Sequence, residues 1–216
     1  MGPGLPRLRR CIRDDIKMET PMTNAAPPLH IVGLSGSLRS GSFNAQLLRA
    51  AARIAPAGVQ IEVETIRGVP LYDGDVEASE GIPAKIAELK DKIAAADALF
   101  LVTPEYNNSI PGVFKNAVDW LTRPASDIGK VFGGKPVAFI GASPGGFGTI
   151  LSQEAWLPVL RTLGTQPWFG GRLMVSRAHK VFDEAGAILD PAIEEALTGY
   201  VAGFSAFVRE VKAGRA

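Results

Sequence analysis

Residues 35–44 read Ser35-Gly36-Ser37-Leu38-Arg39-Ser40-Gly41-Ser42-Phe43-Asn44. The short apolar run 31–34 comes directly before this stretch and predicts a buried strand. After the stretch, apolar residues recur at helical spacing over residues 45–55. We therefore predict that residues 35–44 form a strand-to-helix turn, which is rich in serine and glycine, carries one arginine and has no acid.

This composition is typical of an anion-binding turn. Small residues let backbone N–H groups approach an anion closely, and serine hydroxyls donate hydrogen bonds to it. The N-terminus of the following helix adds a partial positive charge. Arg39 adds a full charge, and its guanidinium group has the fork geometry that suits phosphate oxygens. We interpret residues 35–44 as a phosphate cradle.

Strand and helix patterns alternate along the rest of the chain. Further strands are predicted at residues 59–66, 98–102, 137–142 and 168–175, the last of them irregular at Gly170-Gly171. Further helices are predicted from Pro83 onward, over residues 111–121 and over residues 191–212. Another helix is predicted from the end of the 143–148 loop to about Leu163, with an interruption or bend near Pro158. Residues 67–81 are predicted to be a long loop.

This alternation defines a fold class. Five β–α units predict an α/β fold, with an open five-stranded parallel sheet and helices on both faces. Ligands bind such sheets beyond the carboxyl ends of the strands, at the point where the strand order reverses. The loops after the first, third and fourth strands are rich in Gly, Ser, Asn and Pro, and we expect all three at that edge.

Length and charge exclude several classes of function. A chain of 216 residues suggests one folded domain, which we place at residues 29–216 after a disordered leader over residues 1–28. A short targeting or partner-binding arm is the alternative for the leader. Lys+Arg 23 nearly balances Asp+Glu 22, so no basic field for nucleic acid or a membrane surface is present. No apolar run approaches the ~20 residues of a membrane helix.

Cysteine usage limits the covalent and metal chemistry of the chain. Cys11 is the only cysteine, which excludes an intramolecular disulfide and a cysteine-rich zinc site. We predict no metal site in this chain. A chain without disulfides fits a reducing compartment, and we expect a cytoplasmic protein.

Familiar catalytic motifs nearly match, and each fails for a physical reason. The first turn lacks the three spaced glycines of a dinucleotide fingerprint. Residues 129–135 fit a GxxxxGK phosphate loop, but they precede a strand and are followed by Pro136, which has no hydroxyl for magnesium. Residues 141–145 fit the GxSxG of a serine hydrolase, but Pro144 lacks the N–H that the oxyanion hole requires.

Three segments together resemble the NAD(P)H-dependent FMN reductase family. Residues 36–44 match its GSxRxxSxN phosphate loop, and residues 103–120 and 143–146 resemble its second and third signatures. That family is flavodoxin-like and includes chromate, quinone and azo-dye reductases. The resemblance spans about residues 30–212 and implies a flavodoxin-like three-layer sandwich.

The resemblance also implies which residues hold FMN. The side chains of Ser37, Arg39, Ser42 and Asn44 and nearby backbone amides would hold the 5′-phosphate, with Leu38, Ser40 and Phe43 in the same loop. The isoalloxazine ring would be lined by Pro104, Glu105, Tyr106 and Asn107, largely through backbone groups. Its other edge would be flanked by Ser143, Gly145 and Gly146.

The activity implied is that of an oxidoreductase. NADPH or NADH would deliver hydride to bound FMN, and a quinone, flavin, azo or metal-oxyanion acceptor would then take the electrons at the same face. Because the flavin carries the chemistry, we expect no indispensable catalytic side chain. Two alternatives remain open, namely a flavodoxin-type electron carrier, which the near-neutral charge and Arg39 disfavour, and a flavin-free regulatory module.

A homodimer or homotetramer is also expected. The resemblance implies an assembly of this kind. In addition, residues 111–121 place Val113, Phe114, Val118 and Trp120 on more of a helix circumference than one sheet face can cover. We therefore predict that this helix contributes to a contact between copies.

Overall fold

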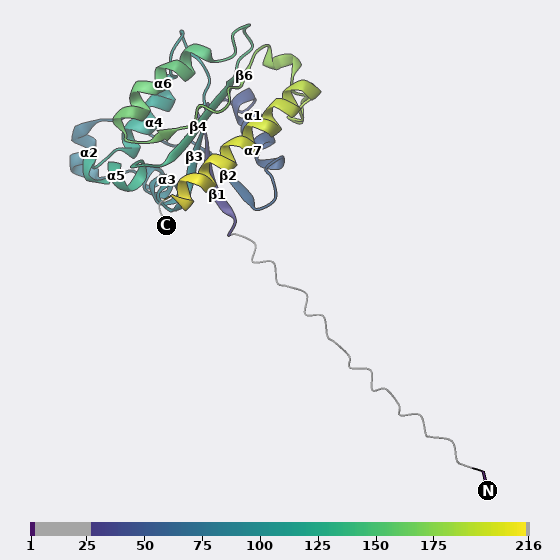
Figure 1. Cartoon of the computed structure of the whole chain (residues 1–216). Helices are drawn as coiled ribbons and strands as arrows, with labels where there is room; N and C mark the ends of the chain where they lie inside the picture. Colours follow the sequence, from purple (N-terminus) through teal and green to yellow (C-terminus); the bar gives the residue numbers. More distant parts are fainter. Residues whose placement is uncertain (3–26, 215–216) are drawn as a thin grey trace.

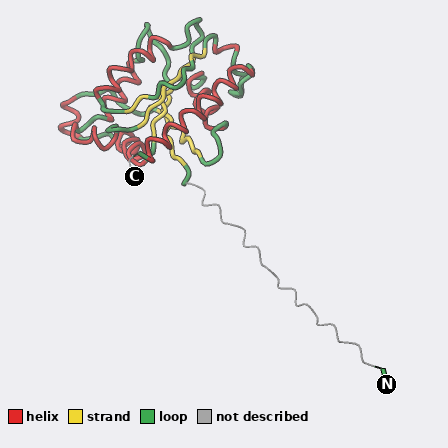
Figure 2. Tube along the Cα trace, in the orientation of Figure 1, coloured by secondary structure: helices red, strands yellow, loops and turns green. Residues whose placement is uncertain are grey.

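The computed structural model describes residues 1–2 and 27–214 (Figures 1 and 2). The expected leader falls almost wholly outside the described residues, so that expectation stays a prediction. The described part from Leu29 onward forms one α/β sandwich, with a central sheet between two layers of helices (Figure 1).

The sheet is parallel throughout, with the strand order β2-β1-β3-β4-β5 and β6 paired with β4. Its main strands are β1 (Leu29–Ser35), β2 (Val59–Thr65), β3 (Ala98–Val102) and β4 (Pro136–Ala142). All five residues of β3 are buried, as expected for a strand that is covered on both faces. The predicted fold class is confirmed, and the strand order is that of the flavodoxin-like fold.

The predicted strand at residues 168–175 is wrong. The structure has two short strands in its place, β5 (Gln166–Pro167) and β6 (Met174–Val175), and both pair with β4. The chain between them leaves the sheet at two glycines that pack against the indole ring of Trp168. A Cβ atom at Gly170 would lie 2.5 Å from Trp168 Nε1, so the detour needs glycine there.

Helices cover both faces of the sheet, as predicted. On one face α1 (Phe43–Arg53) and α7 (Pro191–Ala213) bury a cluster that includes Leu47, Leu48 and Phe204. On the other face lie α3 (Ala84–Ala95), α4 (Gly112–Leu121), α5 (Ile128–Val131) and α6 (Ile150–Thr162), which bury Trp120 and Trp156. Figure 1 shows α7 lying across one side of the strands. The described part of the chain also has two 3-10 helices, Ala125–Asp127 and Ala178–Lys180.

Two local predictions about helices need correction. The expected loop at residues 67–81 contains α2 (Gly74–Glu80), whose N-cap Asp73 accepts a hydrogen bond from the Asp75 N–H. α2 buries none of its residues, so it carries no apolar period that the sequence could reveal. In addition, α6 continues through Pro158, so the expected interruption is wrong, and the alternative of a bend there stays a prediction.

The structural reason given for α4 as a contact between copies is also wrong. Phe114, Val118 and Trp120 are buried within the chain itself. The rings of Tyr72 and Trp120 meet edge to face at 4.9 Å, and Trp120 Nε1 donates to the Pro70 carbonyl at 3.0 Å. The segment between β2 and α2 therefore covers the side of α4 that the sequence pattern leaves exposed.

Candidate functional site

The turn between β1 and α1 is tied to the sheet at its first residue. The Gly36 N–H donates to the Val102 carbonyl at the end of β3, at 2.9 Å. A Cβ atom on Gly36 would lie 2.1 Å from the Phe114 ring, so only glycine lets the turn pass this close to α4. The turn therefore starts in the crevice between β1 and β3, where the strand order reverses.

The polar groups of this turn are arranged as an anion cradle needs them. Ser42 is the N-cap of α1, and its Oγ accepts from the Ala45 N–H at 3.2 Å, which leaves its own hydroxyl hydrogen able to donate. Ser37 is also buried, whereas Arg39 is exposed. Among the described residues, no carboxylate pairs with the Arg39 guanidinium. Its charge is therefore available to a ligand.

Asn44, which the resemblance places at the phosphate, also forms two hydrogen bonds within the chain. It is buried, its Nδ2 donates to the Ala142 carbonyl at 2.8 Å, and its Oδ1 accepts from the Ala142 N–H at 2.9 Å. Both ends of the amide are thus used to join α1 to the end of β4. The sequence gives no sign of this link, because its two residues are 98 positions apart.

The loop after β3 is held by a tight turn. Asn107 and Asn108 have φ values of 50° and 62°, and Tyr106 and Ser109 exchange two backbone hydrogen bonds at 3.2 and 3.1 Å across them. Two successive positive φ angles between paired residues define a type I′ turn, which asparagine tolerates better than most residues. Tyr106 stands at the base of this turn with 44% of its surface exposed.

Glu105 connects this loop to α6. Its Oε2 accepts from the backbone N–H groups of Leu151 and Ser152, at 2.9 and 3.1 Å. Thr149, the N-cap of α6, forms no side-chain cap hydrogen bond, so Glu105 replaces that cap from another part of the chain. The carboxylate is thereby committed to a helix N-terminus and does not face the cradle as an isolated negative charge.

A buried polar cluster strengthens the same junction. Thr103 Oγ1 lies 2.8 Å from Ser152 Oγ and accepts from Trp156 Nε1 at 3.1 Å. Close packing reinforces the contact, since a Cβ atom on Gly141 would lie 1.9 Å from Thr149 Oγ1. The loop after β3 is therefore fixed against α6 on both sides of Pro104.

The loop after β4 is held by a segment that the sequence analysis missed. Backbone hydrogen bonds join Ser143 N–H to Val175 C=O at 3.0 Å, Ala178 N–H to Ser143 C=O at 3.0 Å, and Arg177 N–H to Gly145 C=O at 2.9 Å. Arg177 adopts a left-handed backbone with φ of 49°. The sequence analysis ended its last strand at residue 175, and no local pattern indicated that residues 175–178 form hydrogen bonds with this loop.

These loops enclose one small hollow at the carboxyl edge of the sheet. It has a volume of about 80 Å³ and is lined by Ser37, Arg39, Ser42, Phe43, Asn44, Pro104, Glu105, Tyr106, Ala142, Ser143 and Pro144. Nine of these lining residues are predicted site residues. The other predicted residues, Leu38, Ser40, Asn107, Gly145 and Gly146, belong to the same loops but do not line the hollow.

The size and charge of the hollow fit part of a flavin nucleotide. Whole small-molecule sites are typically about 300–1,000 Å³, so a hollow this small is suited to one phosphate group and not to a whole flavin nucleotide. The cradle offers hydroxyl donors and the Arg39 charge, and the one carboxylate that lines it, Glu105, is held at the α6 N-terminus. The residues present therefore fit FMN.

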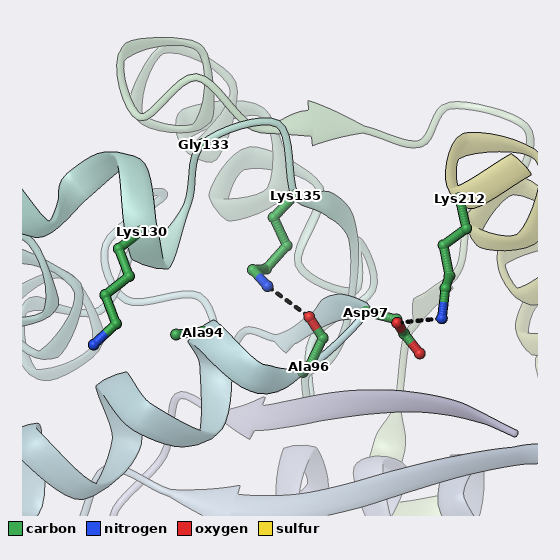
Figure 3. Close-up of a pocket in the computed structure, with 7 residues that line it drawn as sticks. All are labelled: Ala94, Ala96, Asp97, Lys130, Gly133, Lys135 and Lys212. Atoms are coloured by element: carbon green, nitrogen blue, oxygen red, sulfur yellow. Dashed lines mark hydrogen bonds and ion pairs between the residues drawn. The ribbon is translucent and has the colours of Figure 1, made fainter. Parts of the chain in front are cut away.

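A larger hollow, of about 470 Å³, lies near the amino ends of β3 and β4 (Figure 3). Lysines contribute much of its lining, and their ammonium groups already have partners within the chain. Lys135 Nζ donates to the Ala96 carbonyl at 2.6 Å, and Lys212 Nζ pairs with Asp97 at 2.6 Å. We place the candidate site at the smaller hollow, because its donor groups are not used up in this way.

Taken together, the fold and site define a class of protein. A parallel sheet with this strand order, and with an anion cradle where the order reverses, is that of a flavodoxin-like protein that binds a nucleotide beyond the strand ends. Residues 29–180 match the family described as NADPH-dependent FMN reductase. The chain belongs to that family.

Individual relatives agree with this assignment. The chain is 40% identical over 184 residues to a NAD(P)H-dependent FMN reductase of Pseudomonas aeruginosa, covering 85% of this chain and 97% of the relative. It is 38% identical over 189 residues to a quinone reductase of Escherichia coli, with coverage of 85% and 97%. The structure of a flavoenzyme NAD(P)H:(acceptor) oxidoreductase from Paracoccus denitrificans matches with a TM-score of 0.75 and 31% identity, covering 84% of this chain and 98% of that one.

Family membership confirms the predicted enzyme class. The chain is an NAD(P)H-dependent flavin oxidoreductase, with FMN as cofactor and NAD(P)H as co-substrate. This sets aside both alternatives, the electron carrier without a nucleotide substrate and the flavin-free module. Within the described ranges, no helix is both long enough and apolar enough to cross a membrane.

Proposed function

We propose that this enzyme reduces quinones, passing electrons from NAD(P)H through FMN held at the small hollow. The observation that carries the proposal is the convergence of the loops after β1, β3 and β4 on one cradle that has unpaired donors. Among the relatives, the protein from Escherichia coli is named a quinone reductase, and one from Burkholderia, 37% identical over 188 residues, is named a 2-hydroxy-1,4-benzoquinone reductase.

In this proposal, the first turn holds the FMN phosphate. The hydroxyls of Ser37 and Ser42 and the guanidinium of Arg39 line the hollow and donate to phosphate oxygens. The N-terminus of α1 adds a partial positive charge, and no acidic residue in its first turn offsets that charge. Asn44 acts indirectly by holding α1 against Ala142, so the cradle keeps its shape.

The other two loops position the ring. Glu105 and Thr103 fix the loop after β3 on α6, so the backbone at Pro104–Tyr106 approaches a ligand as a rigid edge. Ser143 and Gly145 are held by the 175–178 segment on the other side. Bound FMN supplies the two-electron chemistry. The chain's residues supply position and charge, and no acid–base side chain is assigned.

Anaerobic titration tests the function. We expect the protein, loaded with FMN, to lose its yellow colour when NADPH or NADH is added and to regain it when a quinone is then supplied. Donor and acceptor share one exposed face in this proposal, so initial-rate lines for a quinone should be parallel, as in a ping-pong mechanism. A flavin that neither nucleotide bleaches, or a reduced flavin that quinones fail to reoxidise, would contradict the proposal.

We also propose that the protein is a cytoplasmic homo-oligomer, either a dimer or a tetramer. With the α4 pattern explained inside the chain, support comes from apolar side chains near the start of α6. Phe147 is 83% exposed, and Ile150 and Leu151 are about two-fifths exposed. Light scattering at micromolar concentration tests the idea, and a monomer there would contradict it.

A further inference from the structure

Arg67 touches the phosphate turn from a part of the chain to which the sequence analysis gave no role. Its guanidinium donates to the Leu38 carbonyl. Arg67 follows β2, which lies beside β1 in the sheet with Ser35 opposite Thr65. Its own N–H donates to Thr65 Oγ1 at 3.2 Å. The end of β2 thus places this arginine beside the cradle, on the side away from Asn44 and Ala142.

The tip of the turn has little else to hold it. Residues 38–41 are all exposed, and within the turn the Arg39 N–H makes only a long 3.4 Å contact with Ser37 Oγ. In the described part of the chain, the bond from Arg67 is the one hydrogen bond that reaches residues 38–41 from outside the turn. The conformation of the tip therefore depends on Arg67.

The charge of Arg67 is not neutralised by a neighbour. No carboxylate of a described residue pairs with its guanidinium, whereas Arg123, which lies 5.9 Å from the Tyr72 ring, is paired with Glu77 at 2.8 Å. A guanidinium offers five N–H donors, and the Leu38 carbonyl accounts for one described contact. An arginine that donates to a backbone carbonyl and has no carboxylate partner can hold a turn in place and keep its positive charge near a bound anion.

We propose that Arg67 is a positioning residue for the FMN phosphate: it holds the 38–41 tip so that Arg39 is presented to the cradle. This inference rests on the proposed site. The physical reason is entropic, because an exposed turn that is ordered before binding loses less conformational freedom when the phosphate arrives. Since Leu38 directly precedes Arg39, fixing the Leu38 carbonyl limits the backbone positions open to Arg39.

The test compares FMN with riboflavin, which lacks the phosphate, by titrating flavin fluorescence in the full chain. For Arg67→Ala we expect the Kd of FMN to rise about tenfold, the effect of losing one charge-assisted hydrogen bond, and that of riboflavin to change less than about twofold. Arg67→Lys, which keeps a charged donor, should recover part of the loss. Arg161→Ala is the matched control, since Arg161 is an exposed arginine on α6 whose side chain has no described partner.

A double-mutant cycle with Arg39→Ala then distinguishes a residue that positions Arg39 from a residue that contacts FMN independently. If Arg67 acts by presenting Arg39, replacing Arg67 in the Arg39→Ala background should change FMN affinity less than about threefold. Additive losses would overturn the proposal, because they would mean that Arg67 binds the ligand on its own. Equal losses for FMN and riboflavin would also overturn it, and so would an unchanged FMN affinity in Arg67→Ala.

Failure of the site itself is distinguishable from failure of this inference. If the wild-type protein binds FMN no better than riboflavin, the phosphate cradle is wrong and Arg67 has nothing to position. If the wild type prefers FMN and Arg67→Ala keeps the same preference, the cradle stands and the role of Arg67 is wrong. Thermal unfolding of the apo variants identifies any loss that comes from general destabilisation.

Discussion

Asn44 and Ala142 exchange two hydrogen bonds, and this pair fixes the first turn of α1 to the end of β4. Asn44 lies in the helix that follows β1, and Ala142 is the last residue of β4, so one buried amide holds these two parts of the hollow together. A side chain that the family resemblance assigns to the FMN phosphate thus also joins α1 to the end of β4 beside the hollow.

Replacing Asn44 with alanine should destabilise the protein even without flavin. The change leaves the buried N–H and C=O of Ala142 without partners, so we expect the free energy of unfolding to fall by about 2–4 kcal/mol. Urea denaturation of the apo protein measures this. Asn116→Ala is a control, because Asn116 also bridges two backbone groups but is only half-buried. A loss seen only with FMN present would return Asn44 to the role of a phosphate ligand.

Arg39→Ala should weaken FMN binding selectively. The variant lacks a charge-assisted hydrogen bond to the phosphate, and we expect a loss of about 1.5–3 kcal/mol for FMN, with riboflavin barely changed. The salt dependence of FMN affinity should also flatten, because a screened charge pair is gone. Titrations with both flavins at low and high salt decide the matter. An unchanged FMN affinity would make Arg39 a solvated loop residue.

Glu105→Ala should affect both flavins alike, in contrast to Arg39→Ala. It removes the cap from α6 and releases the loop that lines the ring, so we expect about 1–2 kcal/mol less stability and similar losses for FMN and riboflavin. Glu105→Gln keeps an acceptor oxygen for the Leu151 and Ser152 N–H groups and should recover most of both. If glutamine is as damaging as alanine, the charge and not the cap is what matters.

Substitutions in the turn at Asn107 and Asn108 should be tolerated only where the new residue can adopt a positive φ. Asn108→Gly should be tolerated, because glycine adopts positive φ freely, whereas Asn108→Val should destabilise by about 1–2 kcal/mol, since a β-branched residue resists φ near 62°. Thermal unfolding gives the stability, and riboflavin titration reports whether the ring loop has shifted. Equal behaviour of the two variants would show that the turn opens without cost.

Asp97, which lies at the opposite end of the sheet from the candidate site, should make the free energy of unfolding depend on pH. Burial by itself raises its pKa, but hydrogen bonds from Lys212 and from the His30 N–H outweigh burial and hold the pKa below its ordinary value. A carboxyl whose pKa is lowered by folding stabilises the protein above its unfolded pKa of about 4, and that contribution is lost as the pH falls through the folded value. Asp97→Asn should therefore unfold more easily at neutral pH and show a weaker loss of stability in acid, as measured by urea denaturation.

Local sequence patterns were sufficient to predict the fold class, the strands β1 to β4 and the loops that line the small hollow. This was possible because buried parallel strands and amphipathic helices leave local periodic patterns, and because a phosphate turn has a distinctive composition over ten residues. The sequence did not reveal α2, which buries none of its residues, or the split of the last strand around Trp168.

Tertiary structure alone decided how the site residues divide their roles. Asn44 binds Ala142, Glu105 caps α6 and Arg67 reaches Leu38, and each of these contacts joins residues 29 or more positions apart. No local pattern encodes such a contact, because the side-chain atom and its backbone partner meet only after the sheet has brought their strands together. The sequence therefore locates the loops of the site, and the packing of the sheet and helices decides which side chains are left to meet a ligand.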